Sequence, residues 1–353
     1  MNTPAISDID MSLRCAAVAF AVLVAWRGPH CLSPRWPRSL LIGTWATLAL
    51  ILSYGYLAFY LEGGPRIIDA TAYFLEGRAF SEGQWAWPLS DPQPSVMGRF
   101  MVRTAANDAA AVIFPPGYPA LLAVGFRLGF PLLVGPMLAA ALVLATAHLM
   151  RSVVLLVPSW QRIERPLVHG AAGLSACCAV MRYHTADTMS HGLATLCFTF
   201  ALSCALRQCA SPRGGWHALG FGLSMGWLFA TRPVTALGLG LTLCLYGGLR
   251  TLHRPASVDR RPWLLAAIGL LPGVYLWAHY QQTVTGSMGT TAQALYYAVS
   301  DGPAGCFRYG FGRGIGCLGE HTRFVSDSIG AHYGLLEAIG TSGRRLKTHL
   351  GDP

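Results

Sequence analysis

Long apolar runs separated by short polar connections are the main pattern of this sequence. A helix that crosses the hydrocarbon core of a bilayer needs about 20 mostly apolar residues. Seven runs approach that length and predict spanning helices, at residues 40–60, 131–150, 166–181, 189–206, 217–230, 233–249 and 263–280. Residues 11–26 form a further apolar stretch, which is either an extra span or a helix at the membrane surface. The pattern predicts an all-α polytopic membrane protein with about seven to eight transmembrane helices.

The polar connections predict the orientation of these helices. Alternate short connections carry the arginines Arg27, Arg35, Arg38, Arg151, Arg162, Arg165, Arg207, Arg213, Arg250, Arg254, Arg260 and Arg261. Cytoplasmic loops of membrane proteins carry an excess of Lys and Arg. We therefore expect an N-terminal segment (1–39), a transmembrane bundle (40–280) with a long external loop (61–130), and an external C-terminal loop (281–353).

Composition supports a membrane protein and excludes a nucleic-acid-binding protein. Hydrophobic residues make up 53% of the chain and charged residues only 12%, about half the charged fraction of a typical soluble protein. The net charge of +10 is almost entirely arginine, because Lys347 is the only lysine. Since these arginines lie in short clusters between apolar runs, membrane orientation explains them better than binding to nucleic acid.

The first external loop begins with an amphipathic segment at residues 67–80. Its period is about 100° per residue, as in an α-helix. One stripe contains Ile68, Ala72, Leu75 and Ala79, and the other contains Asp69, Tyr73 and Glu76. This pattern predicts a helix lying on the membrane surface with its acidic stripe toward a cleft.

Four short motifs follow one another on the predicted external face. The first is Phe114-Pro-Pro-Gly-Tyr-Pro119, whose prolines should delay the start of the next helix until about Pro119. The others are His184-Thr-Ala-Asp-Thr-Met-Ser-His191, Thr231-Arg-Pro-Val-Thr-Ala236 and the glycine-rich run from Gly310 to His321. Together with Asp69 on an external helix, this ordered set resembles the GT-C superfamily of glycosyltransferases, and within it the protein mannosyltransferase-like branch.

The resemblance covers roughly residues 40–350 and implies both a fold and a reaction. The fold would be a GT-C-like bundle with an external amphipathic-helix loop. The reaction would move a hexosyl group, of mannosyl type, from a polyprenyl-phosphate carrier to a protein, glycan or lipid acceptor. It would take place on the non-cytoplasmic side of a plasma or inner membrane, among membrane lipids. Members of the family commonly continue with more spans, which favours a truncated reading frame or a fragment.

The resemblance assigns roles to Asp69 and to two arginines. Asp69 would be the general base that takes the proton of the acceptor. Ala70 follows it where the family often has a second acid, and an acid near a helix N-terminus is also explained by the helix dipole. Arg232, before Pro233, would hold the donor phosphate, and Arg182 is a second phosphate candidate. Snorkelling to the headgroups is the alternative explanation for both arginines.

Further candidates lie in the same external segments. Asp187, His191, Tyr118 and His321 are expected to bind substrate. Asp187 would position acceptor, carrier or a divalent metal ion, or else cap the following helix. No other cofactor is expected, because no Cys or His spacing resembles a zinc site. Cys306 and Cys317 share the last external loop, either as a disulfide or as two free thiols.

Two other functions remain as alternatives. A transporter or lipid flippase would also contain spans interrupted by Gly and Pro. Transporters place ionisable groups near the middle of the bilayer, however, whereas the acids of this chain lie in the predicted external loops. The second alternative is a non-catalytic member of the resembled family.

Overall fold

The computed structural model describes residues 38–89, 99–211, 215–253, 261–299 and 333–351. The predicted stretch at residues 11–26, the glycine-rich run, His321, Cys306 and Cys317 lie outside these residues. The chain divides into two compact units. The first unit contains Met1–Trp85 and Pro115–Tyr280, and the second contains Ala86–Phe114 and Gln281–Pro353.

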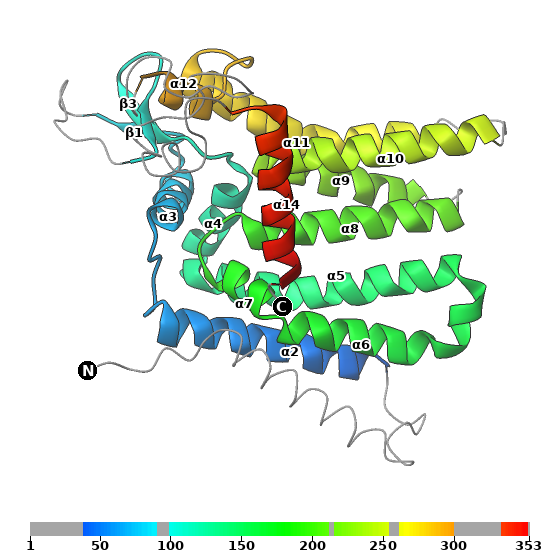
Figure 1. Cartoon of the computed structure of the whole chain (residues 1–353). Coiled ribbons are helices and arrows are strands. Elements are labelled where there is room, and N and C mark those ends of the chain that lie inside the picture. Colours follow the sequence, from blue (N-terminus) through cyan, green and yellow to red (C-terminus); the bar gives the residue numbers. More distant parts are fainter. Residues whose placement is uncertain (1–37, 90–98, 212–214, 254–260, 300–332, 352–353) are drawn as a thin grey trace. The chain divides into compact units, whose positions relative to one another are not determined.

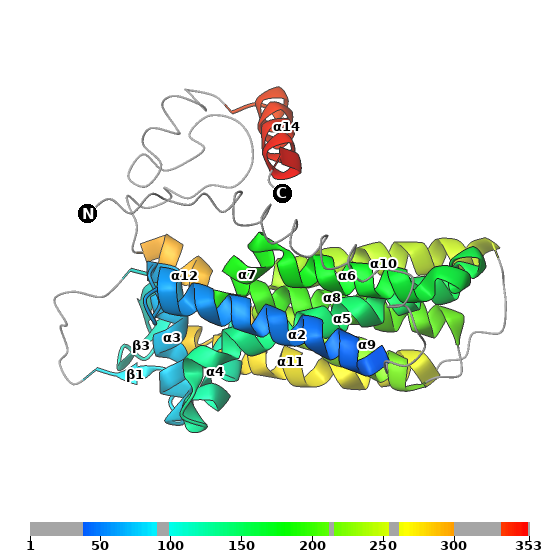
Figure 2. The same cartoon turned by 90° about the horizontal axis from the view of Figure 1, so that it is seen from below.

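The first unit is a bundle of helices that lie side by side (Figure 1 and Figure 2). Its long helices are α2 (Arg38–Gly55), α5 (Val134–Leu156), α6 (Glu164–Cys177), α8 (His191–Ala210), α9 (Gly215–Thr231), α10 (Pro233–His253) and α11 (Arg261–Thr285). A π-helical turn (Tyr56–Tyr60) extends α2, and 3-10 turns (Pro131–Leu133 and Pro158–Ile163) flank α5. Helix α5 packs against α2, α6 and α8, and α9 packs against α8 and α10.

Four segments in the described part of the chain are long and apolar enough to cross a membrane. They are Leu41–Tyr60, Pro131–Leu156, His191–Ala210 and Arg261–Thr285. Each matches one of the seven predicted spans. The chain is therefore a mainly helical membrane protein, as its sequence predicts, whereas the number of seven to eight spans stays a prediction.

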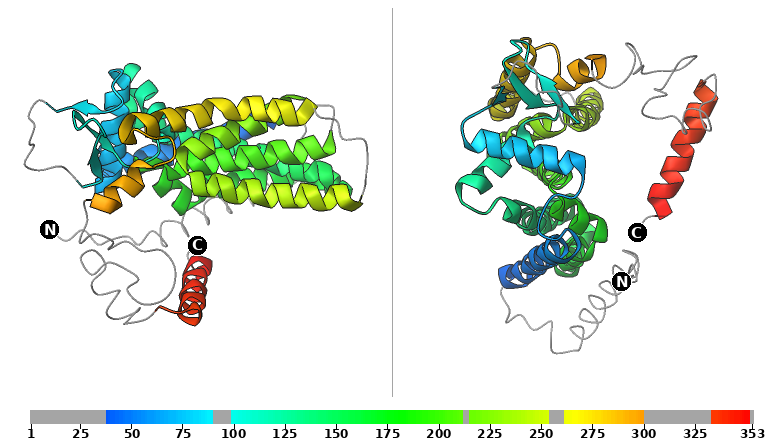
Figure 3. Two further views of the ribbon diagram at one scale, coloured as in Figure 1. Left: turned by 90° about the horizontal axis from the view of Figure 1, so that it is seen from above. Right: turned by 90° about the vertical axis from the view of Figure 1, so that its left-hand side faces the viewer.

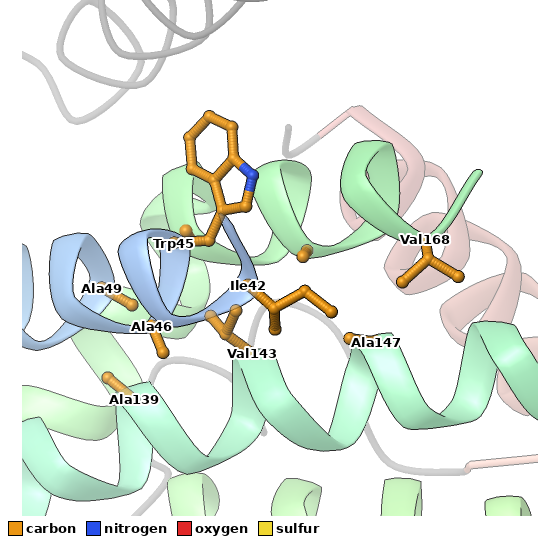
Figure 4. Close-up of a cluster of buried hydrophobic side chains, with 10 residues drawn as sticks. Ile42, Trp45, Ala46, Ala49, Ala139, Val143, Ala147 and Val168 are labelled. Carbon is orange, nitrogen blue, oxygen red and sulfur yellow. The ribbon is translucent and has the colours of Figure 1, made fainter. Parts of the chain in front are cut away.

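Small side chains form the interface between α2, α5 and α6 (Figure 4). Ala46 and Ala49 of α2 face Ala139 and Val143 of α5 in one buried cluster. Small residues let helix backbones approach closely, and the dispersion attraction between closely packed helices holds them together inside a bilayer. The alanines thus let the helices pack closely around the few larger side chains of the cluster, Ile42 and Trp45.

One predicted span is divided in two. Helix α6 ends at Cys177, Cys178 is extended (φ −66°, ψ 118°), and α7 (Ala179–Ala186) begins directly after it. The segment 166–181 is therefore a helix, a break and the start of a second helix. Apolar residues continue through the break, so the hydrophobic pattern does not reveal it.

Helix α3 (Ile68–Ser81) lies across one end of the bundle (Figure 3) and packs against α4 (Gly117–Arg127). Its predicted polar stripe is packed rather than open, because Tyr73 and Glu76 are buried. Ile68 and Leu75 of the predicted apolar stripe are 51% and 41% exposed. The exposed face of α3 also carries Thr71 and Arg78, so it is amphipathic rather than apolar.

Helix α4 begins at Gly117, two residues before the position predicted from the prolines. Pro119 lies in the first helical turn, where a backbone N–H would have no partner within the helix. The helix therefore tolerates this proline and starts after Pro115 and Pro116, two residues before the predicted position of about Pro119.

The second unit contains a small sheet that an all-α prediction does not include. Strands β1 (Trp87–Pro88), β2 (Met101–Arg103) and β3 (Ala109–Val112) are antiparallel, in the order β1-β3-β2. Thr104 Oγ1 donates to Asp108 Oδ1 (2.8 Å) in the turn between β2 and β3. Helices α12 (Ala292–Val299) and α14 (Leu335–Gly351) complete the described part of this unit.

Candidate functional site

Ser190 joins three distant segments of the first unit. It is buried in the turn before α8. The Tyr73 hydroxyl of α3 donates to Ser190 Oγ at 3.1 Å. Arg232 Nε, from the junction of α9 and α10, donates to the same oxygen at 3.2 Å. These bonds bring the polar face of α3, the His184–His191 motif and the Arg-Pro motif to one end of the bundle.

His191 provides a second contact for the Arg232 guanidinium. Arg232 Nη2 lies 3.3 Å from His191 Nε2, and the rings of His184 and His191 are 4.5 Å apart. Because a guanidinium can only donate, His191 Nε2 must be the accepting nitrogen of a neutral ring. Burial lowers the pKa of His184, and the charge of Arg232 lowers it further. The arginine is thus fixed by neutral partners and keeps its full positive charge.

Two glycines allow the elements of this end to approach closely. A Cβ at Gly117 would lie 2.4 Å from Thr231 Oγ1, directly before Arg232. A Cβ at Gly135 would lie 2.1 Å from the carbonyl oxygen of Thr185 in α7. Any side chain at either position would push helices apart, so the glycines of these segments hold the Arg-Pro junction and α7 against the rest of the bundle.

Asp69 and Asp187 form the acidic part of the site. Asp69 is half-exposed in the first turn of α3, where the helix dipole also favours an acid. Asp187 is only 2% exposed. Burial raises the pKa of Asp187, the Thr188 backbone N–H lowers it in part, and the charge of Asp69 raises it again. The two acids are far apart in the chain, and the effect of Asp69 on Asp187 indicates that they lie near each other in the fold.

Several buried polar atoms of α7 and the following turn have no hydrogen-bond partner among the described residues. They are Arg182 Nη1, His184 Nδ1 and the carboxylate oxygens of Asp187, next to which lies the N–H of the neighbouring Thr188. Buried polar atoms without a partner are rare, because desolvation costs each of them about 1–3 kcal/mol. Their concentration within six residues is what a site for a polar ligand requires.

Two phenols line the site as neutral donors. The rings of Tyr73 and Tyr118 meet edge to face, with centroids 5.7 Å apart. Burial raises the pKa of Tyr73 to about 12, although its bond to Ser190 and the charge of Arg232 oppose this shift. Burial also raises the pKa of Tyr118, and the charge of Asp187 adds to the effect. Both hydroxyls therefore stay protonated and act as hydrogen-bond donors, not as bases.

The structure places most of the site residues predicted from the sequence in one region. Direct bonds or electrostatic interactions connect Asp69, Tyr118, Asp187, His191 and Arg232. Arg182 is buried on α7, within two turns of Asp187. His321 and the Cys306–Cys317 pair stay predictions outside the described residues.

The sequence analysis did not assign roles to Tyr73, Ser190 or His184. Tyr73 follows Asp69 by four residues and so shares its helix face, which is the one local signal that points to it. Ser190 and His184 belong to a recognised motif, but their contacts with α3 and Arg232 are long-range. Among the described residues, no group of three or more His, Cys, Asp or Glu side chains is arranged to hold a metal ion.

Comparison of the chain with protein-family models, with curated proteins and with solved structures finds no match.

Proposed function

We propose that the chain is a membrane glycosyltransferase of GT-C type, which moves a sugar from a polyprenyl-phosphate carrier to an acceptor. One observation carries this proposal. An arginine fixed by Ser190 and His191 shares one end of an apolar helix bundle with two carboxylates, Asp69 and Asp187. A phosphate leaving group requires a fixed cation, and an acceptor hydroxyl requires a base, so this pairing matches the two demands of the reaction.

Arg232 is the proposed partner of the donor phosphate. Its Nε and Nη2 are held by Ser190 and His191, so the guanidinium is oriented before the donor arrives. When the bond between the sugar C1 and the phosphate oxygen breaks, negative charge grows on the phosphate. A preoriented cation stabilises that charge without reorganisation. The unpartnered Nη1 of Arg182 is the second donor available to the phosphate.

Asp69 is the proposed base. Two neighbouring carboxylates resist simultaneous ionisation. Asp187 is buried and its pKa is raised, which disfavours its ionised form, whereas Asp69 is half-exposed, so we assign the base to Asp69. As the acceptor oxygen bonds to the sugar C1, its proton passes to Asp69. Asp187 then serves as the hydrogen-bonding partner of a substrate hydroxyl. It would supply the second acid that the resembled family often has at the position of Ala70.

The position of the site also fits the proposed side of the membrane. Helix α8 begins at His191, in the site, and Arg207 lies in its last turn. A helix of this length spans about 30 Å, the thickness of the hydrocarbon core. Because arginine-rich ends favour the cytoplasm, the site belongs on the opposite side.

Label transfer in proteoliposomes tests the proposal. The purified full chain would receive radiolabelled polyprenyl-phosphate mannose, with a membrane extract as the source of acceptors. We expect transfer by the unaltered chain and a loss of about 10²- to 10⁴-fold for Asp69→Asn, with donor binding retained. Glu82→Gln, which changes an exposed acid just after the same helix, is the matched control and should retain activity.

Two results would contradict the proposal. Movement of label into the vesicle lumen without transfer would indicate a transporter or flippase. A folded chain that neither transfers nor moves the label would be a non-catalytic protein.

A further inference from the structure

A second polar cluster lies at the other end of α8, away from the candidate site. Ser203 and Arg207 of α8 meet His148 and Ser152 of α5. Ser152 Oγ and Ser203 Oγ are 2.8 Å apart, and Arg207 Nε donates to Ser152 Oγ at 2.9 Å. Both serines are fully buried. We call these four residues the α5–α8 polar cluster.

Hydrogen-bond accounting gives one consistent arrangement of protons in this cluster. Ser152 donates to the backbone oxygen of His148 at 2.8 Å, so its own proton is used. In this arrangement Ser203 donates to Ser152 and accepts from His148 Nδ1–H. Ser152 accepts from both Ser203 and Arg207. Every hydroxyl is satisfied, and the arrangement holds the Arg207 guanidinium in one orientation.

The remaining donors of Arg207 are not used by the protein. A guanidinium has five N–H groups, of which Nε–H is bound to Ser152. Its four Nη hydrogens have no acceptor among the described residues, whose two ion pairs are Arg66–Glu62 and Arg78–Glu82. Arg151 adds positive charge beside His148. The cluster is therefore a fixed, cationic donor group that forms no ion pair with an acid in the described part of the chain.

The depth of the cluster matches the position of lipid phosphates. Arg207 lies three residues, and Ser152 four residues, from the ends of their helices. At 1.5 Å per residue these residues are about 5–6 Å inside the helix ends, so a helix that just spans the hydrocarbon core places them slightly below the headgroups, within reach of the long arginine side chain. A snorkelling arginine needs only to reach water and does not need a buried serine to orient it.

We propose that the α5–α8 polar cluster binds the phosphate group of an anionic phospholipid. Arg207 contacts the phosphate oxygens through its Nη hydrogens, in the fork geometry that suits this group. Ser152 and Ser203 are positioning residues, because they orient Arg207 and are themselves buried. Arg151 strengthens the attraction through its charge. This site is separate from the proposed transfer site and does not depend on transfer activity.

Native mass spectrometry of the purified full chain tests this site. The protein would be mixed with phosphatidylglycerol, and retained lipid would be compared between variants. We expect Arg207→Ala to weaken retention about ten-fold and Ser152→Ala to weaken it several-fold. Arg162→Ala removes an exposed arginine from the connection between α5 and α6, at the same end of the bundle, and should change retention less than two-fold.

A conservative variant, Arg207→Lys, and a competing ligand, inorganic phosphate, complete the test. Arg207→Lys preserves the charge but not the fork, so it should also lose retention even if Arg207→Ala fails to fold. Equal losses for Arg207→Ala and Arg162→Ala, or no loss for Arg207→Lys, would overturn the proposal. Complete displacement of the lipid by millimolar inorganic phosphate would also overturn it, because it would indicate a site for free phosphate.

Discussion

Near each end of α8 lies an arginine whose Nε is bound to a buried serine. At the first end, Arg232 is bound to Ser190 at 3.2 Å, and at the second, Arg207 is bound to Ser152 at 2.9 Å. The surroundings differ. The first end adds Asp69 and Asp187, while at the second end the described charge acting on His148 comes from arginines and no ion pair with an acid is formed among the described residues. The same device for fixing a guanidinium therefore occurs in two different electrostatic settings.

This difference in charge distinguishes an end that can only bind a phosphate from an end that can also support a reaction. A fixed cation alone can hold a phosphate, as we propose for Arg207. Cleaving a sugar–phosphate bond also requires a group that accepts the proton of the acceptor. Of the two ends, the one with Arg232 contains such groups together with unpartnered buried donors. We therefore expect substitutions at the two ends to affect different measurements.

After the loss expected for Asp69→Asn, the largest expected effect is that of Arg232→Ala. Removing the cation at the leaving phosphate should lower transfer by about 10²- to 10³-fold, as for other preoriented groups that stabilise developing charge. It should weaken donor binding more than acceptor binding. Steady-state transfer and equilibrium binding of labelled polyprenyl-phosphate mannose measure the two effects. Arg162→Ala is the control, and unchanged donor affinity in Arg232→Ala would refute the assignment.

Gly117→Ala should disturb the Arg232 end through packing. Its new Cβ would lie 2.4 Å from Thr231 Oγ1 and 2.9 Å from the backbone of Ala230. Overpacking of this kind costs about 1–3 kcal/mol, so we expect Tm to fall by roughly 5 °C and transfer to fall with it. Gly170→Ala on α6 meets nothing within 4 Å and should leave Tm unchanged or slightly raised. Equal Tm values for both variants would show that Gly117 is not tightly packed.

Ser190→Ala sharpens the comparison by removing only the orienting contact. Arg232 would keep its charge but lose its bond at Nε, and Tyr73 would lose its acceptor. A hydrogen bond to a charged group contributes about 1.5–3 kcal/mol, so donor affinity should fall about ten-fold. Thr242→Val removes a hydroxyl that bonds only within α10 and serves as control in the same binding measurement. An unaltered affinity in Ser190→Ala would mean that Arg232 needs no fixed orientation.

The smallest effect concerns pH and the acids of the first end. Burial raises the pKa of the Glu76 carboxyl well above its ordinary value of 4.5, and the bond with Tyr280 offsets only part of this rise. The folded chain therefore holds a proton that the unfolded chain releases above about pH 4.5. Stability that Glu76 provides at low pH is thus lost as pH rises from 4.5 through the raised pKa.

Glu76→Gln removes this titration while keeping a hydrogen-bonding group. Its Tm should match that of the unaltered chain near pH 4.5 and exceed it by a few degrees at pH 8. Glu82→Gln, at an exposed carboxylate paired with Arg78, should show no such divergence. Thermal unfolding in nanodiscs across this range measures both variants, and parallel curves for Glu76→Gln would contradict the account of this residue.

Local properties of the sequence predict the helices but not all of their ends. The apolar run at 131–150 predicts a span because length and hydropathy are read along a single segment, and the structure has Pro131–Leu156 there. The break at Cys178 lies inside an apolar run and depends on the packing of α7 against α5. The strand Ala109–Val112 is rich in alanine, which favours helices, and it forms through pairing with β1 and β2.

Some residues of the candidate site can likewise be predicted from the sequence, and others cannot. Asp69, Asp187 and Arg232 are found because each belongs to a short motif whose order along the chain is recognisable. Ser190 and Tyr73 are 117 residues apart, and no periodicity predicts their contact. Likewise, Glu76 is buried where it forms a hydrogen bond with Tyr280 of α11. The sequence around Glu76 does not predict this contact.

A structure of the full chain bound to polyprenyl-phosphate mannose tests the central claim most directly. If Asp69, Asp187 and Arg232 form one transfer site, the donor phosphate should lie about 3 Å from the guanidinium nitrogens of Arg232, with the sugar beside the two carboxylates. A donor phosphate bound at the other end of α8, or bound without contact to Arg232, would contradict it.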